Sequence, residues 1–99
     1  MVIKNILKEL ESADKPVGKM LRKGEDFHVL AIGFKKDMIL PEHTTSLPAR
    51  LVVIKGAVTY NNAEGPNKLE LYDEYEIPID EKHWVVASEE SVILVIKGH

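Results

Sequence analysis

The fold of this chain is constrained most by a series of short segments rich in Val, Ile and aromatic residues, each followed by turn-forming residues. The segments cover 27–34, 50–61, 68–78, 83–87 and 91–97. Gly56 divides the second segment in two, since glycine admits the dihedral angles of a tight bend. About eight strands at this spacing favour an all-β barrel or sandwich over an alternating βαβ fold.

One short helix is predicted ahead of the strands, within residues 1–12. Ile3, Ile6, Leu7 and Leu10 recur at the spacing of a single helical stripe. A helix of this length is marginal by itself, so we expect it to dock on the rest of the fold.

Two of the predicted strands are apolar at consecutive positions, "LVVI" at 51–54 and "VILVI" at 92–96. Strands of this kind are normally covered on both faces. In a small barrel the outer face then needs a second layer, either the helix or another subunit. We therefore expect a homodimer. The stretch 61–67, dense in Asn, Gly and Pro, is predicted to be a loop.

Length and composition exclude several classes of protein. A chain of 99 residues is expected to form one domain, 1–99, with a barrel over about 27–97. Without cysteine it has no disulfide, thiolate metal site or cysteine nucleophile. A net charge of -3 with interspersed Lys and Glu argues against a nucleic-acid partner. The apolar runs are too short to cross a bilayer and the N-terminus lacks the pattern of a secretion signal, so we expect a cytoplasmic protein without a membrane partner.

A histidine, two small residues and a glycine occur at a motif-like spacing within 43–56. His43 and Thr45 are followed by Ala49 and, seven residues later, by Gly56. This arrangement resembles the first motif of the cupin superfamily, G-x5-H-x-H-x3,4-E-x6-G, with Thr45 and Ala49 in the places of the second histidine and the glutamate. Cupins are small jelly-roll barrels whose interior often holds a metal. The resemblance implies a cupin-like jelly-roll β-barrel, here with a short N-terminal helix.

A second stretch supports the same resemblance. Pro78 is followed five residues later by His83, as in the second cupin motif, G-x5-P-x-G-x2-H-x3-N. Tyr72 and Asp80 replace the two glycines of that motif, and Ala87 replaces its asparagine. Two of the four metal ligands of the family therefore remain.

The predicted pocket is lined by four residues. Strand alternation places His43, Thr45 and Ala49 on one face, and the resemblance places His83 opposite them. Metal sites in proteins normally have three or four protein ligands, so two imidazoles form a weak site. We accordingly predict either no cofactor or a weakly held divalent metal bound by His43 and His83.

Two classes of function follow. The favoured one is a barrel that binds a small organic molecule in its interior, without turnover and without a complete metal site. The alternative is an enzyme, either metal-dependent through His43 and His83 or a metal-free isomerase or lyase in which one histidine acts as base. The sequence identifies no carboxylate that orients such a base, although Asp80 and Glu81 precede His83 in a loop. The sequence does not assign catalytic residues.

Other polar and aromatic residues have simpler interpretations. Arg50 begins a buried strand and is expected to form a salt bridge at the rim rather than contact an anionic ligand. Trp84 follows His83 and is expected on the outer face of its strand.

Overall fold

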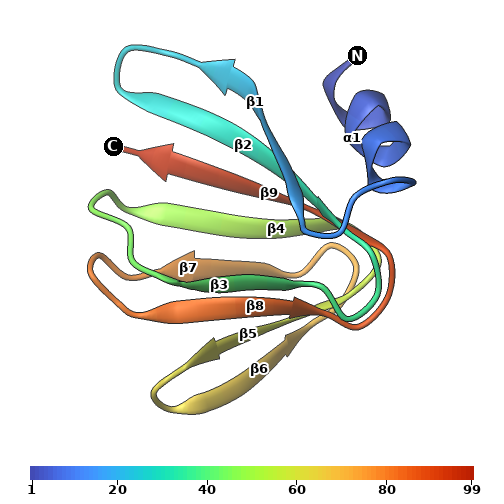
Figure 1. The fold of residues 1–99 in the computed structure, drawn as a ribbon. Coiled ribbons are helices and arrows are strands. Elements are labelled where there is room, and N and C mark those ends of the chain that lie inside the picture. The colour runs from blue at the N-terminus through green and yellow to red at the C-terminus, as the bar shows by residue number, and fades with distance from the viewer.

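The computed structural model describes residues 1–99 and contains one helix and nine strands (Figure 1). No helix in it is both long enough and apolar enough to cross a membrane. The elements are α1 (Val2–Leu10), β1 (Val17–Lys23), β2 (Phe27–Phe34), β3 (Ile39–His43), β4 (Ala49–Lys55), β5 (Val58–Asn62), β6 (Gly65–Leu69), β7 (Glu74–Ile77), β8 (His83–Ala87) and β9 (Ser91–Gly98).

The strands form two antiparallel sheets that face each other as a jelly roll. One sheet has the order β1-β2-β9-β4-β7 and the other β3-β8-β5-β6, so successive strands repeatedly change sheet (Figure 1). The change from β4 to β5 is made at Gly56, whose φ is +73°. A Cβ at this position would overlap the carbonyl oxygen of Glu90 and the hydroxyl of Ser91. This agrees with the bend expected at Gly56.

The core lies between the two sheets. Buried and more exposed residues alternate along β5 and β8, as expected for strands with one face inside. The largest fully buried side chains include Phe34, Leu51, Tyr60 and Ile93, which come from both sheets. The all-β jelly-roll fold predicted from the sequence is thus confirmed.

The N-terminal helix covers part of the outer face of the larger sheet. Ile6 and Leu10 are fully buried and pack with Ala31 of β2 in a small second core. Gly33, two residues further along β2, lets the helix approach closely, because a Cβ there would overlap Ile6. The short helix expected within 1–12 therefore forms and docks on the strands (Figure 1).

The loop predicted at 61–67 is wrong. This stretch is a hairpin in which β5 ends at Asn62 and β6 begins at Gly65, with Asn61 paired to Pro66. Gly65 supplies the turn with a φ of +113°. β6 is the edge strand of its sheet, where a proline without an N–H is tolerated. This hairpin raises the number of strands to nine.

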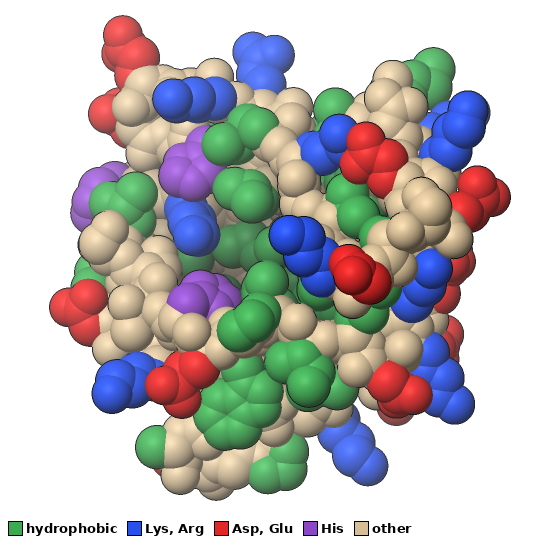
Figure 2. All heavy atoms as spheres, in the orientation of Figure 1, with side chains coloured by type: hydrophobic (Ala, Val, Ile, Leu, Met, Phe, Trp, Pro, Cys, Tyr) green, Lys and Arg blue, Asp and Glu red, His purple; other side chains and the backbone are tan.

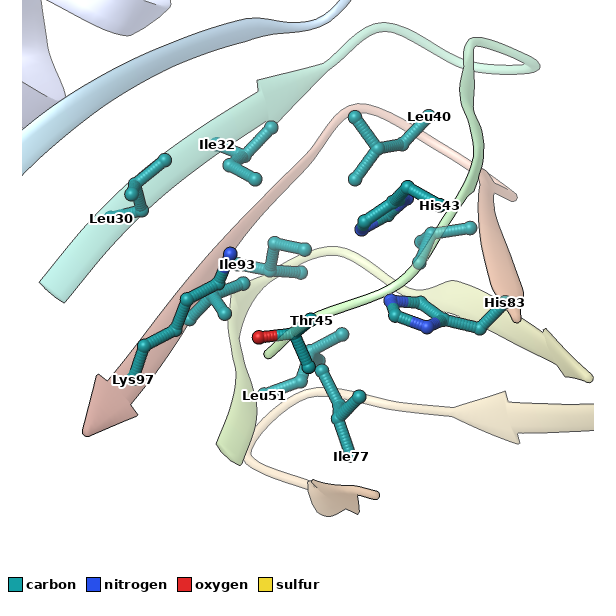
Figure 3. A pocket seen from close by; sticks show the side chains of 12 residues that line it. Leu30, Ile32, Leu40, His43, Thr45, Leu51, Ile77, His83, Ile93 and Lys97 are labelled. Atoms are coloured by element: carbon teal, nitrogen blue, oxygen red, sulfur yellow. The ribbon is translucent and has the colours of Figure 1, made fainter. Parts of the chain in front are cut away.

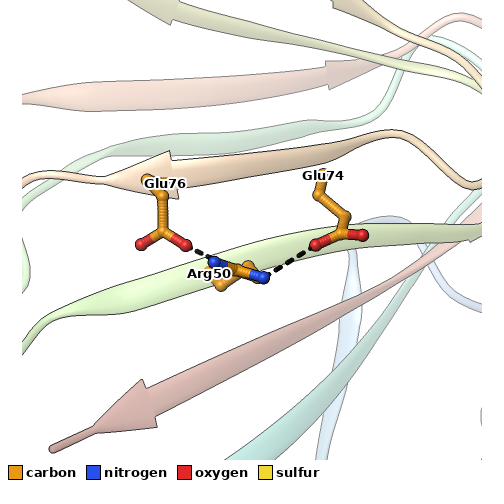
Figure 4. Close-up of polar contacts among 3 residues, drawn as sticks. All are labelled: Arg50, Glu74 and Glu76. Carbon is orange, nitrogen blue, oxygen red and sulfur yellow. Dashed lines mark hydrogen bonds and ion pairs between the residues drawn. The ribbon is translucent and has the colours of Figure 1, made fainter.

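Arg50 is paired as expected from its place at the start of β4. Its Nη1 donates to Glu74 Oε1 at 2.9 Å and its Nε to Glu76 Oε1, both on the neighbouring strand β7 (Figure 4). Glu76 is the cross-strand partner of Arg50 in register. The three side chains are more than half exposed, so this group belongs to the surface.

Candidate functional site

A cavity opens between the two sheets, lined by eight hydrophobic side chains and by His43, Thr45, His83 and Lys97. The volume of the cavity is about 40 Å³. A single water molecule needs about 10–15 Å³, so the cavity has room for about three waters. Figure 2 shows an apolar hollow on this face, with histidine and cationic side chains near its edge.

His43 and His83 are cross-strand neighbours. They are directly opposite each other in the antiparallel pair of β3 and β8. Their ring centroids lie 4.2 Å apart, with the planes inclined by 60° (Figure 3). Directly opposed residues share a face, so the pairing of these two strands brings the two imidazoles together at the cavity.

A β-bulge turns His43 inward. Leu40 pairs with Val85 but His43 pairs with His83, so β3 has one more residue than β8 over this interval. Regular alternation would place Leu40 and His43 on opposite faces, whereas both line the cavity. Pro41 lies inside the irregular interval, where its missing N–H is tolerated.

The outer nitrogen of each imidazole has a fixed partner. Nδ1 of His43 lies 2.8 Å from the carbonyl oxygen of Pro41, and Nδ1 of His83 lies 2.9 Å from that of Glu81. A carbonyl oxygen accepts hydrogen bonds only, so Nδ1 carries the proton in each neutral ring. Nε2 then has a free lone pair. Every side-chain nitrogen or oxygen that is fully shut off from solvent has a hydrogen-bond partner. Nε2 of His83 has no partner, so it must be accessible, and the cavity is where the nearly enclosed His83 is exposed.

The structure places the other two predicted pocket residues differently. Thr45 is 5% exposed and lines the cavity, but from the turn after β3 rather than from a strand. Its hydroxyl donates to the carbonyl oxygen of Leu47 at 3.1 Å, and its own carbonyl accepts from the N–H of Asp80 at 2.8 Å. Ala49 is buried in the core at the start of β4 and is not among the residues that line the cavity.

The Glu81 side chain belongs to a polar group beside His83, in which its carboxylate is hydrogen-bonded to Tyr60 and Asn62 rather than to the imidazole. Glu81 Oε1 accepts from the hydroxyl of Tyr60 at 2.8 Å and from Nδ2 of Asn62 at 3.0 Å. The Tyr60 ring is stacked on that of His83 at a centroid distance of 5.0 Å. Burial and the hydrogen bond to Glu81 raise the pKa of Tyr60, so its phenol stays protonated. These contacts hold the His83 ring from behind.

The charge state of His83 follows from its surroundings. Burial lowers the pKa of His83 below its ordinary value of 6.5, and the neighbouring His43 and Lys97 act in the same direction. The hydrogen bond to the carbonyl of Glu81 opposes them without reversing the shift. At neutral pH the ring is therefore uncharged, and its Nε2 is a hydrogen-bond acceptor or a proton acceptor.

Lys97 is a cavity residue that the sequence analysis missed. It follows Ile93 and Val95 on the inner face of β9, and its ammonium group reaches toward the cavity (Figure 3). Alternation along β9 was the available signal, since residues 93, 95 and 97 share a face. The apolar run ends just before Lys97, which makes a solvated strand end the simpler interpretation of the sequence.

The residues present do not fit the divalent metal that the resemblance implies. No group of three or more His, Cys, Asp or Glu side chains is placed to hold an ion. The Thr45 hydroxyl is bonded to its own turn, Ala49 has no donor, and the ammonium of Lys97 repels a cation from the same cavity. Two imidazoles alone are too few ligands.

Comparison with solved structures shows which fold this is. A RmlC-like cupin from Desulfovibrio desulfuricans superposes with a TM-score of 0.78 at 21% identity, covering 85% of this chain and 82% of its own. A cupin superfamily protein from Desulfitobacterium hafniense gives a TM-score of 0.80 at 12% identity, covering 86% and 78%. This chain has the cupin fold. A cupin-2 domain protein from Shewanella frigidimarina, at a TM-score of 0.75 and 15% identity, covers 98% of this chain and 92% of its own.

The cupin fold is shown by structure and not by sequence. The chain matches no protein-family model, and no curated protein matches it significantly. The cupin resemblance read from His43, Gly56, Pro78 and His83 is confirmed for the fold. In this cupin barrel the site residues differ from the motif at Thr45 and at other positions, so the site has to be understood from its own contacts.

Proposed function

We propose that this cupin barrel binds a small organic molecule in the cavity between its sheets, without a complete metal site. The observation that supports this most is the convergence of four polar side chains, His43, Thr45, His83 and Lys97, on an otherwise apolar cavity. Binding sites for small molecules combine apolar walls with a few polar groups that fix orientation. The free Nε2 of His83 is such a group, already aimed by its bond to Glu81.

A metal-free enzyme is the second candidate, and the geometry of His83 favours it. A general base needs a neutral ring, a fixed tautomer and a free nitrogen toward the substrate. His83 has a lowered pKa, an Nδ1 held by a carbonyl and an Nε2 at the cavity. The base would serve proton abstraction next to a carbonyl group, as in an isomerase or a lyase.

Binding is tested by titrating the protein with a set of small organic compounds and following the ring C–H resonances of its histidines by NMR. Compounds that bind in the cavity shift the signals of His43 and His83 and leave that of exposed His99 unchanged. The substitution Leu30→Phe, which fills the cavity, abolishes these shifts. Val29→Phe, one residue earlier in β2 and on the opposite face, is the matched control and retains them.

Turnover is tested on the compounds that bind, in deuterated water. A histidine base exchanges an acidic C–H of its substrate for deuterium, so the substrate proton signal fades with the wild-type protein and persists with His83→Gln. If compounds bind but none of them exchanges a proton for deuterium, the protein is a binding protein and not an enzyme of this kind. If no compound shifts the two cavity histidines, both candidate functions are refuted.

A further inference from the structure

Lys97 is the only formally charged residue in the cavity lining, and it has no acidic partner. None of the 12 lining residues is Asp or Glu. The ion pairs of the structure use Lys19, Arg50 and Lys55 but not Lys97. A partly buried cation is normally paired, because removing charge from water is costly. Its counter-charge therefore has to come from solvent or from a bound molecule.

The backbone holds Lys97 at this place on both sides. In the central strand β9 it is paired in register with His28 of β2 and with Ala49 of β4. The next residue, Gly98, donates its N–H to the carbonyl of Pro48 at 2.9 Å. Ala49, the inward neighbour of Lys97 across the strands, has no side-chain group that pairs with the ammonium. Lys97 therefore lies within a strand that is paired on both sides, and not in an unpaired chain terminus.

Whereas Lys97 requires a negatively charged hydrogen-bond acceptor on the ligand, the two imidazoles require a hydrogen-bond donor. In its neutral form each ring offers Nε2 as an acceptor to the cavity, since Nδ1–H is committed to a carbonyl. A lone pair repels a carboxylate oxygen but accepts a hydrogen bond from a hydroxyl group. A complementary molecule therefore carries a negative charge at one end, for Lys97, and a hydroxyl donor at the other, for an imidazole.

We propose that the cavity binds short hydroxycarboxylates, with the carboxylate against Lys97 and the hydroxyl donating to Nε2 of His83 or His43. This inference rests on the proposed binding function and names the class of its ligand. The small volume of about 40 Å³ favours the shortest members of this class. The eight hydrophobic lining residues contact the short carbon chain of the ligand.

The test compares three nearly isosteric probes: lactate, propanoate, which lacks the hydroxyl, and lactamide, which lacks the charge. Dissociation constants are measured from the ring signals of His43 and His83 by NMR. Lactate is expected to bind about tenfold more tightly than either of the other probes, because a charge-assisted contact or a hydrogen bond to a fixed acceptor is lost in each.

Variants assign the charge to one side chain. Lys97→Met weakens lactate binding about tenfold and leaves lactamide binding unchanged. Lys68→Met, on the exposed edge strand β6, alters the net charge equally and has no effect on either. Lys97→Gln is a second neutral variant, in case methionine disturbs the end of the sheet, and thermal unfolding verifies that each variant is folded.

Three outcomes separate the inference from the function on which it rests. Equal affinities for lactate and lactamide, unchanged by Lys97→Met, refute the hydroxycarboxylate class but leave the binding function standing. Equal affinities for lactate and propanoate refute the part assigned to the imidazoles. If no probe and no neutral compound shifts the cavity histidines, the binding function itself has failed.

Discussion

Nδ1 of His83 lies 2.9 Å from the carbonyl oxygen of Glu81, two residues earlier in the chain, while the carboxylate of the same Glu81 holds Tyr60. One residue thereby fixes both the tautomer of the imidazole and the phenol stacked on it. The histidine is accordingly a rigid acceptor at the cavity. Each of its two hydrogen-bonding nitrogens has a separate task, one toward the protein and one toward the cavity.

Stability should fall in mild acid because of His83. Its pKa is lowered in the folded protein, mainly by burial, so the unfolded chain binds more protons between that lower value and 6.5. The free energy of unfolding then decreases as the pH falls from about 7.5 through 6.5. The total decrease is about 1.4 kcal/mol for each pH unit by which the pKa of His83 in the folded protein lies below its value in the unfolded chain. Urea unfolding at several pH values measures this. His83→Gln should flatten the dependence and His99→Gln should not; a pH profile that His83→Gln leaves unchanged contradicts the assignment.

Removing the Glu81 carboxylate should destabilise the protein. Glu81→Ala leaves the hydroxyl of buried Tyr60 without an acceptor, which costs about 1–3 kcal/mol, and leaves Nδ2 of Asn62 with only the Tyr75 hydroxyl at 3.4 Å. Tyr60→Phe removes the orphaned hydroxyl, so the double variant should lose less than the sum of the single variants. Urea unfolding of the four proteins tests this. Strict additivity would show that the two side chains do not interact.

Zinc should leave the wild-type unfolding midpoint unchanged. The cavity offers two imidazoles and the cation of Lys97, which is a poor donor set for a divalent ion. The combined substitution Thr45→His and Lys97→Met supplies a third imidazole from a residue that lines the cavity and removes the charge, and zinc should raise its midpoint. Near-stoichiometric metal in the purified wild-type protein, lost in His43→Ala and in His83→Ala, would contradict this prediction.

The homodimer stays a prediction, and one outer surface offers a test. Ile96 of β9 is 37% exposed and faces outward, with Val29 and Arg50 as its cross-strand neighbours. If this face joins two subunits, Ile96→Lys should turn a dimer into a monomer in light scattering after gel filtration. Ile79→Lys, an equally drastic change at another exposed isoleucine, should not. A monomeric wild-type protein at every concentration would exclude the homodimer.

Sequence reasoning reached most of the fold because the local signals agree with one another. The strands at 27–34, 83–87 and 91–97 are apolar, β-branched and bounded by turn residues, and the structure keeps them with little change. The hairpin at 61–67 was missed because Asn and Pro there are typical of loops. An edge strand accepts such residues, and whether a strand lies at an edge is decided by its distant neighbours.

The candidate site was less accessible from the sequence, for the same reason. Motif spacing indicated His43 and His83, which the structure brings to one cavity. Glu81 acts through Tyr60 and Asn62, which are 21 and 19 residues away in sequence. Lys97 is placed by the register of β9 with β4. Neither residue belongs to a motif, so no local pattern points to them. Ala49 was assigned to the pocket by alternation from His43, which does not extend across the intervening turn.

The extra residue in β3 implies that the bulge absorbs one residue more than the juxtaposition of the two imidazoles requires. Deletion of Glu42 would leave Leu40 and His43 two residues apart, so regular alternation alone would keep both side chains on the cavity face, opposite Val85 and His83. In the shortened protein the ring signal of His43 should still respond to cavity ligands. The loss of one codon at this point would thus leave the imidazole pair connected.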